Sequence, residues 1–165
     1  MKAPSPTQVD AIPGELRELP QWVCAKVEQR DGRTTKVPYR ADGATRASTT
    51  EPATWTTFER ALETVEAGEA EAVGFVLGGG LVGVDLDRVR DPDTGQLEPW
   101  AAAEIAALDS YTEISLSGTG VHVILRGELP AGSRHRAGQV EVYDTARYFV
   151  VTGQHVAGTP TTIEH

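Results

Sequence analysis

The chain has 165 residues, a formal net charge of −9 and a single cysteine. This length is typical of one domain with a single hydrophobic core. One cysteine excludes an internal disulfide and a cysteine-rich zinc site, no apolar run is long enough to cross a bilayer, and the acidic balance argues against a protein that coats nucleic acid non-specifically.

The first third of the chain predicts a lead-in and a hairpin. Residues 1–18 are polar and contain three prolines, so we expect a loosely ordered segment before the domain proper, 19–165. Strands are predicted at 21–28 and 35–39, because Asp31-Gly32 between two apolar runs is a hairpin signal. Pro38 lacks the N–H that a central strand donates, which places the second strand at a sheet edge.

The middle of the chain alternates loop, helix and strand. After a loop over 41–51, apolar spacing predicts a helix from about 54 to 67, capped by Thr54 and closed by Gly68. Residues 72–77 are predicted as one arm of a second hairpin. The three glycines at 78–80 would then turn the chain into the strand that carries Asp85 and Asp87.

The last third predicts one helix and several short strands. Pro99 suits the first turn of a helix that runs to Leu108. Strands are expected at 112–115, 121–126, 139–143 and 148–151. Because strands outnumber helices and hairpins are frequent, the pattern favours an α+β fold, with a mixed or antiparallel sheet and helices packed on one face.

Asp85 and Asp87 end a buried strand. Strand alternation directs Val82, Val84 and Leu86 to one face and both carboxylates to the other. A cation between two like charges on one face reduces the repulsion between them, and hard divalent cations prefer carboxylate oxygens. The pattern is equally typical of a strand that runs into a polar turn, where Arg88 and Arg90 would pair with the aspartates.

Two further stretches carry polar groups in strands. The turn 117–120 precedes His122, and such glycine-rich turns can direct backbone N–H groups at an anion; a half-buried histidine bonded to a neighbouring strand is the alternative. Glu141 alternates with two valines and shares a face with Tyr143, whereas Asp144 falls on the valine face or in the following turn. Glu141 therefore fits either of two roles: a metal ligand, or an ordinary polar residue on a strand face that is exposed to water.

Three strands thus carry, in chain order, an Asp-x-Asp pair, a Ser-Gly-x-Gly-x-His run and an acid between apolar residues. The combination resembles the archaeo-eukaryotic primase superfamily, in its bacterial, phage and plasmid primase-polymerase branch. The matching stretches are Val82-Gly83-Val84-Asp85-Leu86-Asp87, Ser117-Gly118-Thr119-Gly120-Val121-His122, and Val140-Glu141-Val142-Tyr143-Asp144 with Arg147-Tyr148-Phe149. Weaker similarities extend the resemblance from about Leu19 to Gly153.

This resemblance implies an RRM-like catalytic core that joins nucleotides on a DNA template, using two Mg²⁺ or Mn²⁺ ions. Asp85, Asp87 and Glu141 would hold the metals, and these three with His122 would be the catalytic residues. The incoming triphosphate would contact Ser117, Gly118, Thr119, Gly120, His122, Arg147, Tyr148 and Lys36.

The implied partners are (d)NTPs and a single-stranded or primed DNA template, with no membrane partner. Longer relatives carry helicase domains, so a chain of this length fits an excised catalytic domain or a stand-alone relative. The implied location is the cytoplasm of a bacterium, or of the bacterial host of a phage or plasmid. Two other functions fit the same residues: a nucleotide- or nucleic-acid-binding module with little catalysis, and a metal-dependent nuclease.

Overall fold

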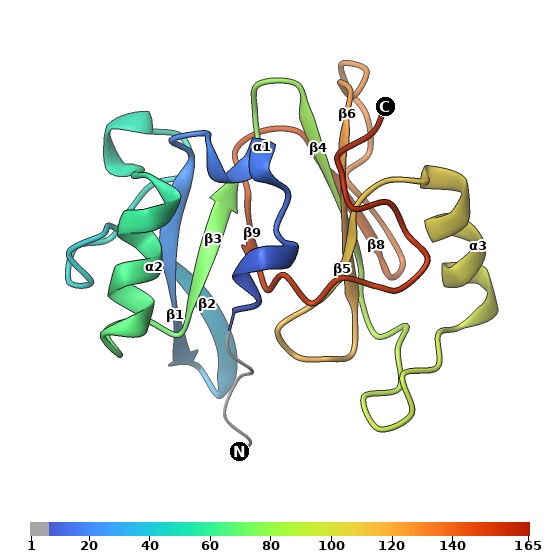
Figure 1. Ribbon diagram of the computed structural model, residues 1–165, viewed down its shortest axis with the longest axis horizontal. Coiled ribbons are helices and arrows are strands. Elements are labelled where there is room, and N and C mark those ends of the chain that lie inside the picture. Colours follow the sequence, from blue (N-terminus) through green and yellow to red (C-terminus); the bar gives the residue numbers. More distant parts are fainter. Residues whose placement is uncertain (1–6) are drawn as a thin grey trace.

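A computed structural model of the protein describes residues 7–165 and shows two antiparallel sheets with helices on their outer sides (Figure 1). The first sheet has the strand order β2-β1-β3-β9, and the second has the order β5-β6-β4-β8-β7. Every strand pairing is antiparallel. The α+β class is confirmed, with the strands divided between two sheets.

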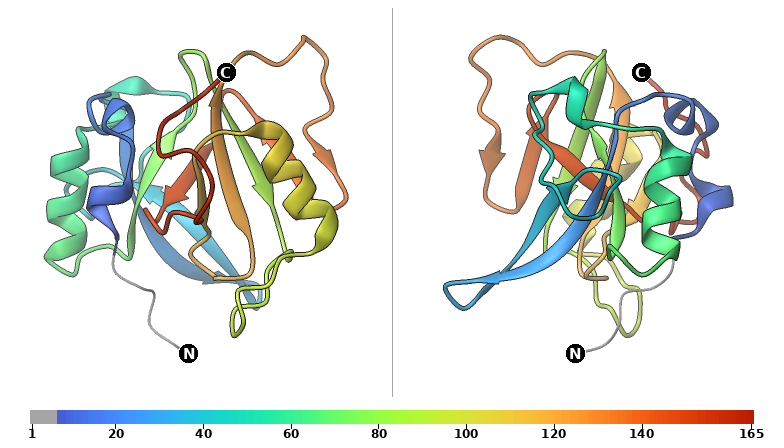
Figure 2. Two further views of the ribbon diagram at one scale, coloured as in Figure 1. Left: turned by 45° about the vertical axis from the view of Figure 1, so that its right-hand side comes forward. Right: turned by 90° about the vertical axis from the view of Figure 1, so that its left-hand side faces the viewer.

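The first sheet begins with a long hairpin. It consists of β1 (Trp22–Arg30) and β2 (Arg33–Tyr39), joined at Asp31 and Gly32, where both residues have positive φ. Figure 2 shows the far end of this hairpin extending away from the body of the protein. β2 is the outermost strand of its sheet, as Pro38 predicted.

The chain passes between the two sheets at two short connections. β3 (Ala72–Val76) lies in the first sheet and β4 (Leu81–Leu86) in the second, so the predicted hairpin between them is wrong. Gly78, Gly79 and Gly80, all with positive φ, make this crossing. The return crossing joins β8 (Val140–Tyr143) to β9 (Tyr148–Val151). The two crossings bring the facing sides of the sheets together.

The remaining strands complete the second sheet. β5 (Thr112–Ile114) and β6 (Val121–Arg126) flank β4 on one side, and the two-residue β7 (Arg136–Ala137) pairs with β8 on the other. Side chains at alternate positions of β4 pack against α3 (Pro99–Leu108) through Val82, Val84 and Leu86. The opposite side of β4 carries Leu81, Gly83 and Asp85, which face the first sheet.

The other main helix, α2 (Phe58–Glu66), packs on β1 and β3. Thr57, whose hydroxyl accepts a hydrogen bond from the Arg60 amide, caps it; Thr54 lies in the preceding 3₁₀ turn η2 (Pro52–Thr54), so the expected cap is wrong by three residues. Within the described part of the chain, no helix is both long and apolar enough to cross a membrane.

Part of the expected lead-in is ordered. Residues 9–17 form η1 (Val9–Ala11) and α1 (Gly14–Arg17), and residues 1–6 lie outside the described part. Ile12 and Leu16 are buried, and the Leu16 carbonyl accepts a hydrogen bond from the indole of Trp22. Residues 9–17 differ from the loosely ordered segment expected there, because two apolar side chains anchor this polar stretch to the core.

Candidate active site

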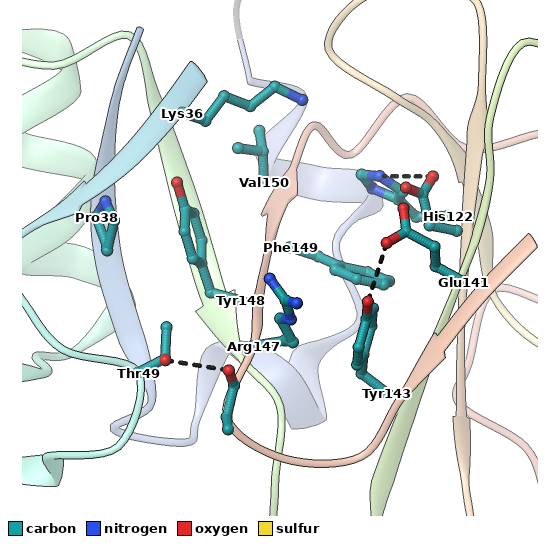
Figure 3. A pocket seen from close by; sticks show the side chains of 12 residues that line it. Lys36, Pro38, Thr49, His122, Glu141, Tyr143, Arg147, Tyr148, Phe149 and Val150 are labelled. Carbon is teal, nitrogen blue, oxygen red and sulfur yellow. Dashed lines mark hydrogen bonds and ion pairs between the residues drawn. The ribbon is translucent and has the colours of Figure 1, made fainter. Parts of the chain in front are cut away.

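A cavity of about 430 Å³ opens between the facing sides of the two sheets (Figure 3). β2 and β9 form one wall, and β4, β6 and β8 form the other. Its lining includes six residues singled out in the sequence: Lys36, Asp85, His122, Glu141, Arg147 and Tyr148. The lining residues that sequence reasoning did not assign to a site are Pro38, Thr49, Tyr143, Ala146, Phe149 and Val150.

Strand register brings the ionisable groups into one row across the second sheet. Asp85 is the direct partner of Glu141 on β8 and of His122 on β6. His122 is in turn the direct partner of Glu113 on β5. Directly paired residues project to the same face of a sheet. Three carboxylates and one imidazole therefore follow one another on the same face of the sheet, and all of them except Glu113 line the cavity.

Asp85 lies at the centre of this row. Burial raises the pKa of its carboxyl above the ordinary value, the nearby His122 opposes that change, and the charges of Glu141 and Asp87 add to it. Its Oδ1 atom is 3.6 Å from Nε2 of His122. A buried carboxylate beside a second carboxylate is costly to ionise without a cation. Asp85 thus has the electrostatic environment expected of a cation ligand.

Glu141 is held by two donors on one oxygen. Arg136 Nη2 lies 2.7 Å and the Tyr143 hydroxyl 2.9 Å from its Oε1. Burial raises the pKa of Glu141, but these two hydrogen bonds together with the charges of Arg136 and Arg147 outweigh burial and lower the pKa overall. Arg136 belongs to the short basic stretch Arg134-His135-Arg136, and it forms an ion pair with Glu141. In this arrangement the guanidinium supplies the positive charge beside Glu141.

Asp87 does not reach the cavity. It follows the last residue of β4, its side chain is 56% exposed, and its Oδ2 lies 3.7 Å from Nε of Arg88. The alternation that would put it beside Asp85 ends with the strand. In the described part of the chain, residues 7–165, no three histidine, cysteine, aspartate or glutamate side chains form a complete metal site. Asp85 and Glu141 have the donor chemistry for a hard cation, and Asp87 is exposed enough to rotate.

The turn Ser117–Gly120 also lies outside the lining of the cavity. Its hydroxyl groups bond within the turn, where Ser117 Oγ is 2.9 Å from Thr119 Oγ1. The carbonyls of Gly118 and Thr119 accept hydrogen bonds from Arg90. A Cβ at Gly120 would lie 2.7 Å from the Leu86 carbonyl oxygen and 3.5 Å from Cα of Asp87. The turn is therefore next to Asp87, at the end of β4.

Two cationic groups line the cavity, one from the first sheet and one from the crossing between β8 and β9. Lys36 projects from β2, and the Arg147 guanidinium lies 4.6 Å from the ring centroid of Tyr143. Thr49 donates a hydrogen bond to the Ala146 carbonyl at the cavity rim. The Tyr148 hydroxyl is buried without a hydrogen-bond partner among the described residues, and burial raises its pKa.

Two glycines make room for the aromatic residues of β9. A Cβ at Gly83 would lie 2.6 Å from Cε2 of Phe149, and one at Gly74 would lie 2.5 Å from Cδ2 of Tyr148. The Phe149 ring consequently reaches across to His122, with ring centroids 4.7 Å apart. The glycine in Val-Gly-Val-Asp thus admits a ring from the opposite sheet.

Among the residues that sequence reasoning missed, Tyr143 carried a signal, since it lies two positions after Glu141 and shares its strand face. Thr49 carried none, because it belongs to a loop. Asp144 lies outside the cavity lining. Its carboxylate accepts a hydrogen bond from the Leu129 amide, and this bond ties the end of β8 to a loop that is distant in the sequence.

Comparison with known proteins agrees with the sequence pattern. No family model matches the chain. A protein named DNA primase-polymerase, from Nitratiruptor phage NrS-1, is 36% identical over 146 residues, which cover 84% of this chain. This chain is homologous to part of that protein. It spans about one fifth (20%) of that relative's length, so the likeness concerns one part of a much longer protein.

Proposed function

We propose that the cavity between the sheets is the nucleotide- and metal-binding centre of a DNA-templated nucleotidyltransferase, a primase or polymerase. The observation that carries the proposal is the pairing of Asp85 with Glu141 and His122 in a cavity that Lys36 and Arg147 also line. Carboxylates and cations that line one cavity suit a metal-bound triphosphate. Homology to a protein named DNA primase-polymerase supports the same activity.

Each residue then has a role that its surroundings support. Asp85 and Glu141 would hold the divalent ions, with Asp87 joining them after its exposed side chain rotates. Bound Mg²⁺ or Mn²⁺ would supply the charge that activates a 3′-hydroxyl and stabilises the leaving pyrophosphate. Lys36, Arg147 and His122 would contact phosphate oxygens, because cationic and imidazole N–H groups are strong donors to anions. The Tyr148 ring would bound the nucleoside.

The turn Ser117–Gly120 has a different place in the proposal. It lies beside Asp87 rather than in the cavity, so its hydroxyl groups would meet the far end of the triphosphate at the rim. Movement of Asp87 toward Asp85 would bring the metal, the turn and the cavity into one continuous site. We propose on the same grounds that the protein works with a DNA template and with a helicase domain or helicase protein.

The test is one assay with three substrates. The protein is incubated with Mg²⁺ or Mn²⁺ and a primed template, an unprimed single strand with labelled (d)NTPs, or a labelled duplex. Extension or new synthesis, lost in Asp85→Asn and retained in Asp93→Asn, is the expected result; Asp93 is an exposed aspartate outside the cavity lining. Degraded duplex without synthesis would point to a nuclease, and nucleotide binding without either reaction to a binding module.

A further inference from the structure

Glu113 is a fully buried carboxylate with an incomplete set of partners. Its side chain is 0% exposed and comes from β5, behind the row of groups that face the cavity. Burying a charged carboxylate is costly unless hydrogen bonds compensate for its lost hydration. Three donors are present: the Tyr111 hydroxyl at 2.8 Å, the Thr152 amide at 2.8 Å and the Gly153 amide at 3.1 Å.

These donors are distributed unequally between the two oxygens. Oε1 accepts from Tyr111 and Gly153, whereas Oε2 accepts from Thr152 alone. A carboxylate has about four acceptor positions, two on each oxygen. One position on Oε2 is therefore left, and that oxygen is 3.7 Å from Nδ1 of His122.

His122 has the complementary deficiency. Its side chain is 7% exposed, and Nδ1 is buried without a hydrogen-bond partner among the described residues. The other ring nitrogen, Nε2, lies on the cavity side, 3.6 Å from Asp85. Packing against the Phe149 ring restricts how the imidazole can turn. The one unpaired nitrogen of the ring thus lies next to the one unfilled acceptor of Glu113.

We propose that Glu113 is a positioning residue for His122: its Oε2 accepts a hydrogen bond from Nδ1–H and so directs Nε2 toward the triphosphate in the cavity. The inference rests on the proposed function for the identity of that ligand. The distance of 3.7 Å exceeds a hydrogen bond, and such contacts are often long until a ligand binds. The hydrogen bond made by one ring nitrogen fixes the role of the other.

A double-mutant cycle separates positioning from mere structural support. Binding of a fluorescent deoxynucleoside triphosphate with Mg²⁺ is measured for Glu113→Gln, His122→Ala and the double variant. We expect Glu113→Gln to weaken binding about 10-fold alone, the scale typical of outer-shell partners, and less than about twofold when His122 is absent. An equal loss in both backgrounds would overturn the proposal.

Tyr111→Phe is the matched control. It removes one of Glu113's hydrogen bonds but leaves the oxygen that faces His122 untouched. We expect it to lower thermal stability as Glu113→Gln does, while it weakens nucleotide binding by less than about threefold. A loss of affinity as large as that of Glu113→Gln would show that general stability, not the imidazole, governs binding.

A second measurement needs no substitution of Glu113 and no activity. The ¹⁵N shifts of the His122 ring, assigned by comparison with His122→Ala, report which nitrogen carries a proton. A proton on Nδ1 is the expected result with and without nucleotide, and Nε2 carries a second proton when it donates to the bound triphosphate. A bare Nδ1 with a protonated Nε2 would overturn the proposal. Should no nucleotide bind at all, the proposed function fails, and this measurement still decides the role of Glu113.

Discussion

Asp85 on β4 and Glu141 on β8 are direct partners across two neighbouring strands, 56 positions apart in the sequence. Register therefore places two carboxylates side by side on the wall of one cavity. Each has a different neighbour, since Glu141 is paired with the Arg136 guanidinium and Asp85 lies next to the His122 imidazole. This asymmetry leads to most of the predictions below.

The first prediction concerns catalysis. Asp85→Asn or Glu141→Gln should each lower nucleotide transfer by at least about 100-fold, because removing a ligand removes several kcal/mol of charge stabilisation by the metal. Glu66→Gln is the control for the glutamate, since Glu66 is exposed on α2. Extension rates at saturating nucleotide decide the outcome. Near wild-type rates in either cavity variant would contradict the assignment.

The second prediction concerns pH and stability. Burial, with Glu141 and Asp87 nearby, raises the pKa of Asp85 in the folded protein. A raised carboxyl pKa means that the folded state holds its proton more tightly, so stability falls as pH rises from the unfolded pKa through the folded one. Asp85→Asn removes this penalty. We expect it to melt a few degrees higher than wild type at pH 7 without metal, and this gain to vanish near pH 3.

Differential scanning calorimetry at both pH values, with chelator present, checks this. Adding Mg²⁺ or Mn²⁺ should stabilise the wild type more than the variant, because a bound ion stabilises only a state that can hold it. A variant that melts below wild type at pH 7 would show that the Asp85 carboxylate is favourably paired.

The third prediction concerns Arg136. Its guanidinium is hydrogen-bonded to Oε1 of Glu141, a carboxylate that a bound cation would also need, and its side chain is 70% exposed. Arg136→Ala should tighten Mn²⁺ binding by up to about fivefold, since an exposed ion pair is worth about 1 kcal/mol or less. Titration calorimetry measures this, with the exposed Arg134→Ala as control. Weaker Mn²⁺ binding in Arg136→Ala would indicate that the arginine organises the site.

The fourth prediction concerns DNA. Residues 22–46 contain six lysines and arginines and three acids, a formal charge of +3 in a chain of −9. The far end of the β1–β2 hairpin, with Arg30 and Arg33, is exposed and extends from the body of the protein (Figure 2). We expect the isolated chain to bind single-stranded DNA weakly and to release it steeply as salt rises.

Replacing Arg30 and Arg33 with alanine should lower that affinity and reduce the salt slope by about one for each phosphate that the protein no longer neutralises. Arg60→Ala, on the exposed side of α2, is the control. Binding isotherms at several salt concentrations measure both quantities. An unchanged slope would place the DNA elsewhere, and tight, salt-insensitive binding would contradict an electrostatic grip altogether.

The fifth prediction concerns Gly83, which makes room for Phe149. A Cβ there would lie 2.6 Å from the Phe149 ring and 2.8 Å from Leu77. Gly83→Ala should cost about 1–3 kcal/mol of unfolding free energy, the usual range for overpacking. Gly14→Ala, whose Cβ would meet only an arginine tip at 3.9 Å, should change it by less than about 0.5 kcal/mol. Urea unfolding compares them, and equal stabilities would mean that Phe149 can move aside.

Local patterns in the sequence predict much of this fold, because alternation and turn chemistry act over a few residues. The alternation of Val82, Val84 and Leu86 with Asp85 predicts which side of β4 faces the core, and Asp31-Gly32 predicts the hairpin. Partners of strands depend on distant packing. The glycines at 78–80 indicated a turn, yet whether they close a hairpin or cross to another sheet depends on where β9 and β6 pair.

The same limit applies to the site. Asp85, Glu141 and His122 could be singled out by residue type and parity, but their contact is a matter of register between three strands. Asp87 was expected beside Asp85 because the alternation was extended one residue past the end of the strand. Glu113 lies four positions before the Ser117–His122 stretch in the sequence. Its buried place behind His122 follows only from the pairing of β5 with β6.

One measurement tests the central claim most directly: a crystal structure with Mn²⁺ and a non-hydrolysable deoxynucleoside triphosphate, in which anomalous scattering locates the metal. The account predicts manganese bound by carboxylate oxygens of Asp85 and Glu141, Arg136 displaced from Glu141, and the triphosphate between Lys36 and Arg147. Manganese held by Asp144 with Glu141 turned away, or a nucleotide bound outside the cavity, would contradict it.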